Sequence, residues 1–396
     1  MFAIASSSLC ARITLNAYSD VLTYGAIGDG KTDDSNAFLK AWDDVCGTAE
    51  DTPTLTIPND KTFMLQPLLF KGPCKPTSIK IELKGTVVAP RVVDDWKFKE
   101  DNKTWIRFSG INGLFIIGGG KIDGQGSSWW TKYPRKSNET NKPTAIRFSN
   151  CHNLTISNLT HIDSPRNHIS IDGCKDTSIS NLHIAAPGDS PNTDGIDIAS
   201  STNVLINNSI METGDDCIAI NNGSSFINIS GIFCGPGHGI SVGSLGKDRT
   251  YAAVEHIYVK NCTFNGTSNG ARIKTFEGGS GYARNITYED IILVRVKHPV
   301  IIDQHYDPRN IDNIGQAVKV SDVTYLNIRG TSLVNNAIEL NCDTVIGCTN
   351  IILNNINITL VDGGETQTIC TKAQGKCSSC NPDVPCLSRN SSTIRY

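Results

Sequence analysis

Side chains that could do acid–base chemistry recur in the middle of the chain at a nearly constant spacing. They are two carboxyl motifs, an imidazole and a pair of cations: Asp194, Asp215 with Asp216, His238, and Arg272 with Lys274. Asp194 precedes Asp215 by 21 residues, and Asp215 precedes His238 by 23. Carboxylates held close together cannot all ionise cheaply, so one of them keeps a proton. Brought together, these residues could supply both a proton donor and a proton acceptor.

Such a set suits the cleavage of a glycosidic bond, which needs an acid at the leaving oxygen and a base or nucleophile at the anomeric carbon. His238 could bond one carboxylate and bias which one keeps the proton. Arg272 and Lys274 alternate with Ile273, so a strand would point both cations to one face and Ile273 into the core. Two cations beside an acid site favour a substrate that carries its own carboxylate.

Each motif alone has an ordinary structural explanation. An Asp-Asp pair is commonly a solvated turn or a calcium ligand, a Gly-His-Gly motif a tight corner, and an Arg-x-Lys motif an exposed strand edge. Asp215 and Asp216 would also point in opposite directions on a regular strand. Both can act only if the backbone turns there, which Gly214 would permit. The spacing of the motifs is what joins them into one candidate site.

Short β-rich segments recur from about residue 105 onward and would position these side chains. Their first residues are Gly113, Asn153, Asp176, Asn203, Phe226, His256, Asn285, Asp322 and Asn350. From Asn153 on, the intervals run from 23 to 37 residues, with no long helices between the segments. An antiparallel sandwich would instead show strands about every 8–12 residues. The pattern therefore predicts a solenoid.

The predicted fold is all-β: a right-handed parallel β-helix with a short N-terminal capping helix. The helical pattern covers residues 36–45, and Asp33, Asp34 or Ser35 could cap it. Residues one coil apart stack at about 4.8 Å, so the repeat turns the spaced motifs into a column. The asparagines that begin several repeats would lie at corners, where Asn adopts a left-handed backbone conformation at little energetic cost. Residues 1–17 are interpreted as a truncated leader, and residues 18–396 as a single domain.

Composition narrows the class of protein. The net charge of −3 favours neither nucleic acid nor an anionic membrane as partner. No apolar run reaches the roughly 18 residues of a membrane span. Fourteen cysteines, four of them crowded between 370 and 386, favour disulfides over a zinc site. Twelve Asn-x-Ser/Thr sequons also favour secretion, although stacked corner asparagines would explain some of them: Asn102, Asn138, Asn153, Asn158, Asn207, Asn222, Asn228, Asn261, Asn265, Asn285, Asn357 and Asn390.

The motifs together resemble the polygalacturonases of plants, which are glycoside hydrolases of family 28. The matching stretches are residues 24–30, 124–130, 190–197, 213–220, 234–243 and 272–274, and the resemblance runs from about residue 20 to 390. It implies a secreted, wall-located, inverting hydrolase without a metal, acting on polygalacturonan, an acidic polysaccharide. We expect a monomer that binds no nucleic acid and no membrane.

The resemblance also assigns roles. Asp215 would be the general acid, Asp194 and Asp216 would activate water, and His238 would tune the acid. The substrate-binding residues would be Asn192, Arg272, Lys274 and Tyr306. The implied disulfides are Cys46–Cys74, Cys217–Cys234 and Cys342–Cys348, with further bridges in the tail. Of the remaining cysteines, Cys10 is left over, while Cys151, Cys174 and Cys262 are expected to be buried small hydrophobes.

The tail and residues 243–247 look closest to pollen-type exopolygalacturonases, so exo action is favoured over endo action. Two other classes stay open. A calcium-dependent pectate lyase would use the three aspartates as ligands, and a wall-binding protein would not use them for catalysis at all.

Overall fold

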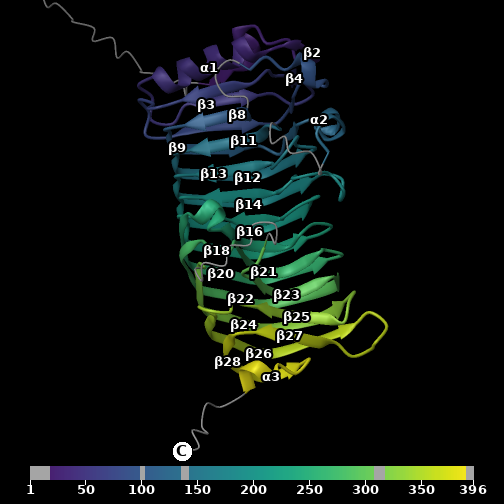
Figure 1. The fold of residues 1–396 in the computed structure, drawn as a ribbon. Coiled ribbons are helices and arrows are strands. Elements are labelled where there is room, and N and C mark those ends of the chain that lie inside the picture. Colours follow the sequence, from purple (N-terminus) through teal and green to yellow (C-terminus); the bar gives the residue numbers. More distant parts are fainter. Residues whose placement is uncertain (1–17, 99–102, 135–141, 307–316, 389–396) are drawn as a thin grey trace, which may run out of the picture.

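The computed structural model describes residues 18–98, 103–134, 142–306 and 317–388 (Figure 1). Its strands stack along one axis into two sheets, with purple N-terminal coils at one end and yellow C-terminal coils at the other. All pairings between named strands are parallel, because each coil pairs with the next in the same direction. The predicted right-handed parallel β-helix is confirmed. Among the described residues, no helix is long and apolar enough to cross a membrane.

One sheet has 11 strands, which are short, and we call it the short-strand sheet. Its members follow one another along the axis in chain order: β5 (Leu68–Lys71), β8 (Thr104–Ser109), β11 (Thr144–Ser149), β13 (Ile169–Asp172), β15 (Ile196–Ala199), β17 (Ile218–Ile220), β19 (Ile240–Leu245), β21 (Asn269–Thr275), β23 (His298–Asp303), β25 (Asn336–Asn341) and β27 (Gln367–Thr371).

The other sheet has 17 strands and bends around the rest of each coil. Its N-terminal strands are short: β1 (Tyr18–Asp20), β2 (Asp29–Asp33), β3 (Thr54–Ile57), β4 (Thr62–Met64), β6 (Ile79–Leu83), β7 (Thr86–Val88), β9 (Asn112–Ile117) and β10 (Lys121–Asp123). The later ones are longer: β12 (His152–Ile162), β14 (Lys175–Ala185), β16 (Thr202–Glu212), β18 (Ser225–Cys234), β20 (Tyr251–Asn265), β22 (Ser280–Val296), β24 (Lys319–Ser332), β26 (Cys348–Leu360) and β28 (Ala373–Asn381).

Apolar residues at every second strand position fill the bore. In the short-strand sheet Ile196, Ile218 and Ile240 lie in register on successive strands, and all three are fully buried. Such stacking places like side chains one strand spacing, about 4.8 Å, apart along the axis. The alternate residues of the same strands point outward, so the short-strand sheet presents a continuous outer face.

The corners explain the residues that begin the repeats. All nine of them, from Gly113 to Asn350, have left-handed φ values of 51–71°. A second row with φ of 47–64° follows five residues later in eight coils: Asn158, Asn181, Asn208, Gly231, Asn261, Asp290, Asn327 and Asn355. Short polar side chains adopt this conformation most easily, which is why Asn and Asp dominate both rows. Four sequon asparagines, Asn153, Asn158, Asn261 and Asn285, occupy such corner positions.

The capping helix α1 (Ser35–Gly47) lies where the sequence predicts it. Its buried face includes Phe38 and Trp42, and the Trp42 ring lies 5.3 Å from that of Phe70 in the first short strand. Asp34 occupies the N-cap position without capping the helix. Its carboxylate accepts from the backbone of Ile27 and Gly28 instead. Two further short helices, α2 (Ser127–Lys132) and α3 (Pro385–Ser388), were not predicted.

The disulfides implied by the resemblance are present. They are Cys46–Cys74, Cys217–Cys234 and Cys342–Cys348, and the tail adds Cys370–Cys386 and Cys377–Cys380. Cys151, Cys174 and Cys262 are buried free thiols, as expected. Cys10, the interpreted leader 1–17 and the sequons at Asn102, Asn138 and Asn390 lie outside the described residues.

Candidate active site

The predicted column forms on the outer face of the short-strand sheet. Asp194 lies just before β15, the Asp215–Asp216 pair just before β17, and His238 just before β19, while Arg272 and Lys274 lie on β21. These four strands are consecutive neighbours in the sheet. The structure therefore brings together all six residues that the spacing singled out.

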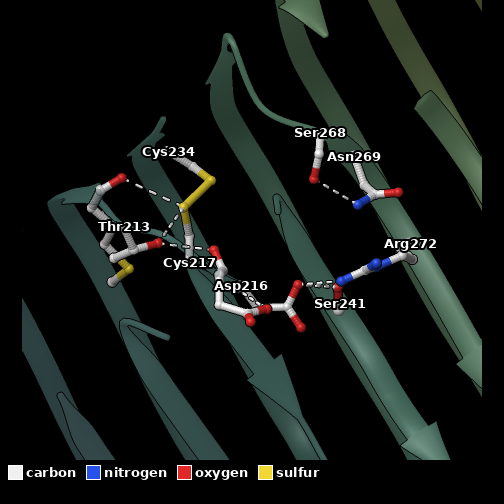
Figure 2. Close-up of a disulfide and its surroundings, with 10 residues drawn as sticks. Thr213, Asp216, Cys217, Cys234, Ser241, Ser268, Asn269 and Arg272 are labelled. Atoms are coloured by element: carbon white, nitrogen blue, oxygen red, sulfur yellow. Dashed lines mark hydrogen bonds and ion pairs between the residues drawn. A yellow bond between two sulfur atoms is a disulfide. The ribbon is translucent and has the colours of Figure 1, made fainter. Parts of the chain in front are cut away.

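Asp216 lies at the centre of a buried charge cluster (Figure 2). Its side chain is 1% exposed and forms ion pairs with Arg272 and with Lys274, the latter at 2.7 Å from Nζ. Ser241 Oγ donates to the same carboxylate at 2.9 Å, and Arg272 Nε donates to Ser241 at 2.8 Å. Two cationic donors and a hydroxyl thus fix the position of this carboxylate. Asp216 is therefore suited to orient water.

Asp215 faces a different partner from its neighbour. Its Oδ1 lies 2.8 Å from His238 Nδ1, and its carbonyl accepts from the His238 backbone at 2.8 Å. The bond between an imidazole and one carboxylate, anticipated from the sequence, is thus observed. The two adjacent carboxyls differ in environment, since one is bound by two fixed cations and the other by an imidazole that can gain or lose a proton.

The chain turns between β16 and β17, as the adjacent aspartates require. Gly214 permits this turn because it has no side chain. Its φ is not left-handed; instead, a Cβ at this position would lie 2.1 Å from the carbonyl oxygen of Ser190. Gly214 also donates its N–H to Thr193 Oγ1 at 3.0 Å. The glycine thus allows two successive coils to approach closely beneath the aspartates.

Asp194 and Asp197 lie near these carboxyls, and the pKa values of both are raised. Burial raises the pKa of Asp194 well above its usual range, and the nearby Asp197, Asp215 and Asp216 raise it further. Burial likewise raises the pKa of Asp197 to about 7. Burial and crowding of the carboxyls therefore raise the pKa of Asp194 and of Asp197, as the sequence predicted for neighbouring acids.

Sequence reasoning missed Asp197. It lies on β15 with its side chain on the outer face, and its Oδ1 is buried with no hydrogen-bond partner among the described residues. The signal was present in the sequence, because Asp197 lies between the inward-facing Ile196 and Ile198. Strand alternation therefore places its carboxyl on the same face as the column of candidate residues.

The two cations are less available than the sequence suggested. Arg272 and Lys274 are only 7% and 6% exposed, while Ile273 points into the core as predicted. Burial opposes the charge of Lys274, but Asp216 outweighs it and raises the pKa of Lys274. Lys274 Nζ also lies 5.0 Å from the ring centre of Tyr306, which is 38% exposed. Tyr306 thus marks the point where this buried cluster meets the surface.

Asn192 projects from the same loop as Asp194 and is exposed, with φ of 62°. Its side-chain oxygen accepts from Lys142 Nζ at 3.1 Å, and the same amine donates to the carbonyl of Pro191 at 2.8 Å. Lys142 is 4% exposed and was not anticipated from the sequence. It ties the loop that carries Asn192 and Asp194 to the coil before β11.

Two histidines support Asp194 from inside the bore. His168 is fully buried, and both its backbone N–H and its Nδ1 contact the carbonyl oxygen of Asp194, at 2.8 and 2.9 Å. Burial lowers the pKa of His168 to about 4. The ring of His161 packs edge-on against His168, with centroids 5.0 Å apart. Both imidazoles are thus held neutral beneath the loop that carries Asp194.

A metal ion fits this site poorly. Asp215, Asp216 and His238 offer ligand atoms within 4.8 Å of one another. Calcium, however, takes about six to eight oxygen ligands, whereas Asp216 is already bound by Arg272, Lys274 and Ser241. A divalent ion would have to displace two buried cations or lie against them. The donor set therefore does not favour the calcium-dependent lyase alternative.

Comparison with known proteins identifies the family of the chain. The model of the family described as glycosyl hydrolases family 28 matches residues 46–380. A probable polygalacturonase from Arabidopsis thaliana is 48% identical over 93% of this chain and 80% of its own length. Polygalacturonase-2 from Solanum lycopersicum is 40% identical over 89% and 77%. Among solved structures, endo-xylogalacturonan hydrolase from Aspergillus tubingensis superposes with a TM-score of 0.76 at 26% identity, covering 92% of this chain and 99% of that one.

Proposed function

Because the chain belongs to glycosyl hydrolases family 28, we propose that it hydrolyses the α-1,4 bonds between galacturonates in polygalacturonan, with inversion at the anomeric carbon. Its plant relatives from Arabidopsis thaliana and Solanum lycopersicum are named as polygalacturonases, which supports this substrate. The single observation that carries the proposal is that two adjacent carboxyls have different partners. Asp216 contacts two cations, and Asp215 contacts an imidazole.

In the proposed mechanism Asp215 protonates the leaving glycosidic oxygen, and His238 adjusts how readily it releases that proton. Asp216 and Asp194 orient and deprotonate the attacking water. Arg272 and Lys274 hold the Asp216 carboxylate in place, and burial raises the pKa of the neighbouring Asp194. Inversion needs acid and base carboxyls about 6.5–9.5 Å apart, with water between them. The expectation of inversion comes from the family resemblance.

Substrate binding would use the same cations. Lys274 carries three N–H donors, and its contact with Asp216 accounts for one of them. A galacturonate carboxylate could approach Lys274 where Tyr306 meets the surface, with Arg272 behind. Asn192 would contact the sugar from the opposite wall. Cations fixed in advance by Asp216 would not need to reorganise when the substrate binds.

Replacement of the proposed acid tests the mechanism. We expect Asp215→Asn to lower the rate of release of reducing ends from polygalacturonate by about 10²–10⁴-fold, the usual contribution of a positioned acid. Asp60→Asn, at an exposed turn, is the matched control and should retain full activity. Circular dichroism would verify that both variants fold. Unchanged activity in Asp215→Asn would show that the catalytic assignment is wrong.

Product analysis tests the mode of cleavage and the lyase alternative. The resemblance of the tail favours exo action, for which galacturonate monomer appears from the first minutes. Endo action would give a spread of oligomers, and one observation favours it: the outer face of the short-strand sheet continues past the site on both sides. Hydrolysis should persist with EDTA present. Unsaturated products, or loss of activity with EDTA, would instead indicate a lyase.

The proposed setting is the plant cell wall, reached by secretion. Five disulfides within the described residues are typical of proteins that fold in an oxidising compartment. We propose that the protein acts there as a monomer on pectin.

A further inference from the structure

We propose that Asn228 is an N-glycosylation site whose glycan covers an apolar patch on the outer face of the 17-stranded sheet. The patch consists of Leu205, Phe226 and Tyr258, which surround Asn228. The proposal rests on the proposed function only for the secretory route, because N-glycans are attached there. It goes beyond that function because it concerns the other sheet, on which none of the six column residues lies.

The first observation is how β18 presents this sequon. Asn228 begins the sequence Asn-Ile-Ser, in which Ser230 supplies the hydroxyl that the acceptor motif requires. Both residues alternate with the buried Ile227 and Ile229, so they lie on the outer face of the strand. Asn228 is exposed, and its side-chain amide forms no hydrogen bond with another described residue. Its Nδ2 is therefore available to carry a sugar.

The sequon at Asn222, only six residues earlier, shows the contrast. Asn222 is also exposed, but its Oδ1 accepts from the backbone N–H of Ala253 at 2.9 Å. Its sequon hydroxyl, on Ser224, is 1% exposed and donates to the carbonyl of Ile198 at 3.4 Å. The fold thus uses both polar groups of this sequon to join neighbouring coils, whereas it leaves Asn228 unused.

The second observation is an aromatic ring beside Asn228. Of the twelve sequons in the chain, only this one has an aromatic residue two positions before its asparagine. That residue is Phe226, which is 53% exposed and stacks on His256 with ring centroids 4.6 Å apart. The electron-rich face of an aromatic ring attracts the C–H groups of a sugar. The exposed corner asparagines Asn261 and Asn285 have no such ring, so Asn228 is the sequon best placed to hold its first sugar.

The third observation is that the neighbouring strands complete an apolar patch. Leu205 on β16 lies in register with Asn228 and is 41% exposed. The half-buried Tyr258 lies in register on the other side, on β20. Figure 1 shows β18 between these two strands, midway along the stack. Grouped apolar side chains at a surface often mark a covered region, and strand neighbours lie only about 4.8 Å apart. A glycan on Asn228 would cover them.

The modification transfers an oligosaccharide from a lipid-linked oligosaccharyl diphosphate. The bond between the anomeric carbon of the first N-acetylglucosamine and the diphosphate oxygen breaks. A bond from that carbon to Asn228 Nδ2 forms, the amide nitrogen gives one proton to a base, and the lipid diphosphate leaves. Nothing is oxidised or reduced.

Mass spectrometry tests the site. The full chain is produced in plant cells behind an added secretion leader, purified from the medium and treated with peptide N-glycosidase A in heavy-oxygen water, which converts a glycosylated Asn into labelled Asp. We expect the label at position 228 in the unsubstituted protein and in Ser230→Thr, and its loss in Ser230→Ala, which keeps the asparagine. An unlabelled Asn228 in the secreted protein would overturn the proposal, even if other sequons carry the label.

The melting temperature tests the contact with the patch. Ser230→Ala should lower it by about 1–2 °C, because the sugar no longer packs on the ring. The same substitution should lower it less in a Phe226→Ala background. Phe115→Ala, which removes an exposed ring from β9, is the matched control and should preserve the full decrease. An equal decrease with and without Phe226 would show that the glycan does not cover the patch.

A reducing-end assay on the same preparations separates this proposal from the proposed function. If the protein carries the label at Asn228 but does not cleave polygalacturonate, the proposed hydrolysis fails and the glycosylation site remains. If it cleaves polygalacturonate but Asn228 is unlabelled, the glycosylation site fails and the hydrolysis remains.

Discussion

The pKa values of single residues in this protein depend on burial as much as on nearby charges. The neutral His168 has a lowered pKa of about 4, so it favours folding less as pH falls from about 6.5 toward 4. The contribution of Asp197 to stability changes with pH in the opposite direction. Its pKa is raised to about 7, so the folded protein is penalised as pH rises from about 3.8 through 7. In the mildly acidic range, the effect of His168 on how stability changes with pH therefore opposes that of Asp197.

Asp197→Asn isolates one of these effects. Asn keeps the shape of the protonated acid and cannot ionise, so we expect it to raise the free energy of unfolding by about 2 kcal/mol at pH 8 and to leave it unchanged at pH 4. Urea titrations at the two pH values measure the difference, with Asp60→Asn as the exposed control. An equal gain at both pH values would show that ionisation of Asp197 is not the cause.

Sequence alone could identify the residue types of the site but only some of their partners. The spacing of Asp194, Asp215 and His238 predicted one column because the coil length is nearly constant. It could not reveal that Arg272 and Lys274 both bind Asp216, since that depends on side-chain conformations in a buried cluster. Lys142 was missed for a similar reason, because it lies 49 residues from its partner Pro191.

At the scale of elements, the corners determine where each strand begins. Asn350 has φ of 54°, and its Nδ2 donates to Asp322 Oδ1 on the preceding coil at 2.8 Å. Phe226 and His256 adopt the same backbone conformation without this chemistry, and their rings stack at 4.6 Å instead. The usual Asn or Asp at a corner could therefore be predicted from the sequence repeat. Phe226 and His256 could not, because their corner conformation depends on a neighbour one coil away.

Substitution of a corner asparagine tests this account. Asn350→Ala should lower the free energy of unfolding by about 1–2 kcal/mol, because alanine disfavours a left-handed backbone. Asn350→Gly should cost less, since glycine adopts that backbone freely. Asn354→Ala is the control, because this residue is exposed on the same strand without a left-handed φ. Equal losses at 350 and 354 would contradict the account.

At the scale of the whole molecule, two disulfides serve different regions. Cys217–Cys234 joins the coil that carries Asp216 to the coil that follows it (Figure 2). Cys46–Cys74 ties the last turns of α1 to the loop after β5, far from the site in sequence. Both close loops of modest length, so each should stabilise folding by about 3 kcal/mol.

Paired replacement by alanine should separate their roles. Cys217→Ala with Cys234→Ala should lower both the melting temperature and kcat, because the turn at Asp216 loses its tether. Cys46→Ala with Cys74→Ala should lower the melting temperature and leave kcat unchanged. Differential scanning calorimetry and reducing-end assays measure the two effects. A fall in kcat for the second pair would mean that the end of the solenoid is coupled to the site.

The helix α1 also determines where the stack of coils ends. A parallel β-helix has no intrinsic length, since each coil offers the next one unpaired backbone and an open apolar bore. Phe38 and Trp42 cover that bore at the first coil, so the apolar core of the described residues is closed at this end. The cap thus opposes growth of the stack into a fibre from its N-terminal coil.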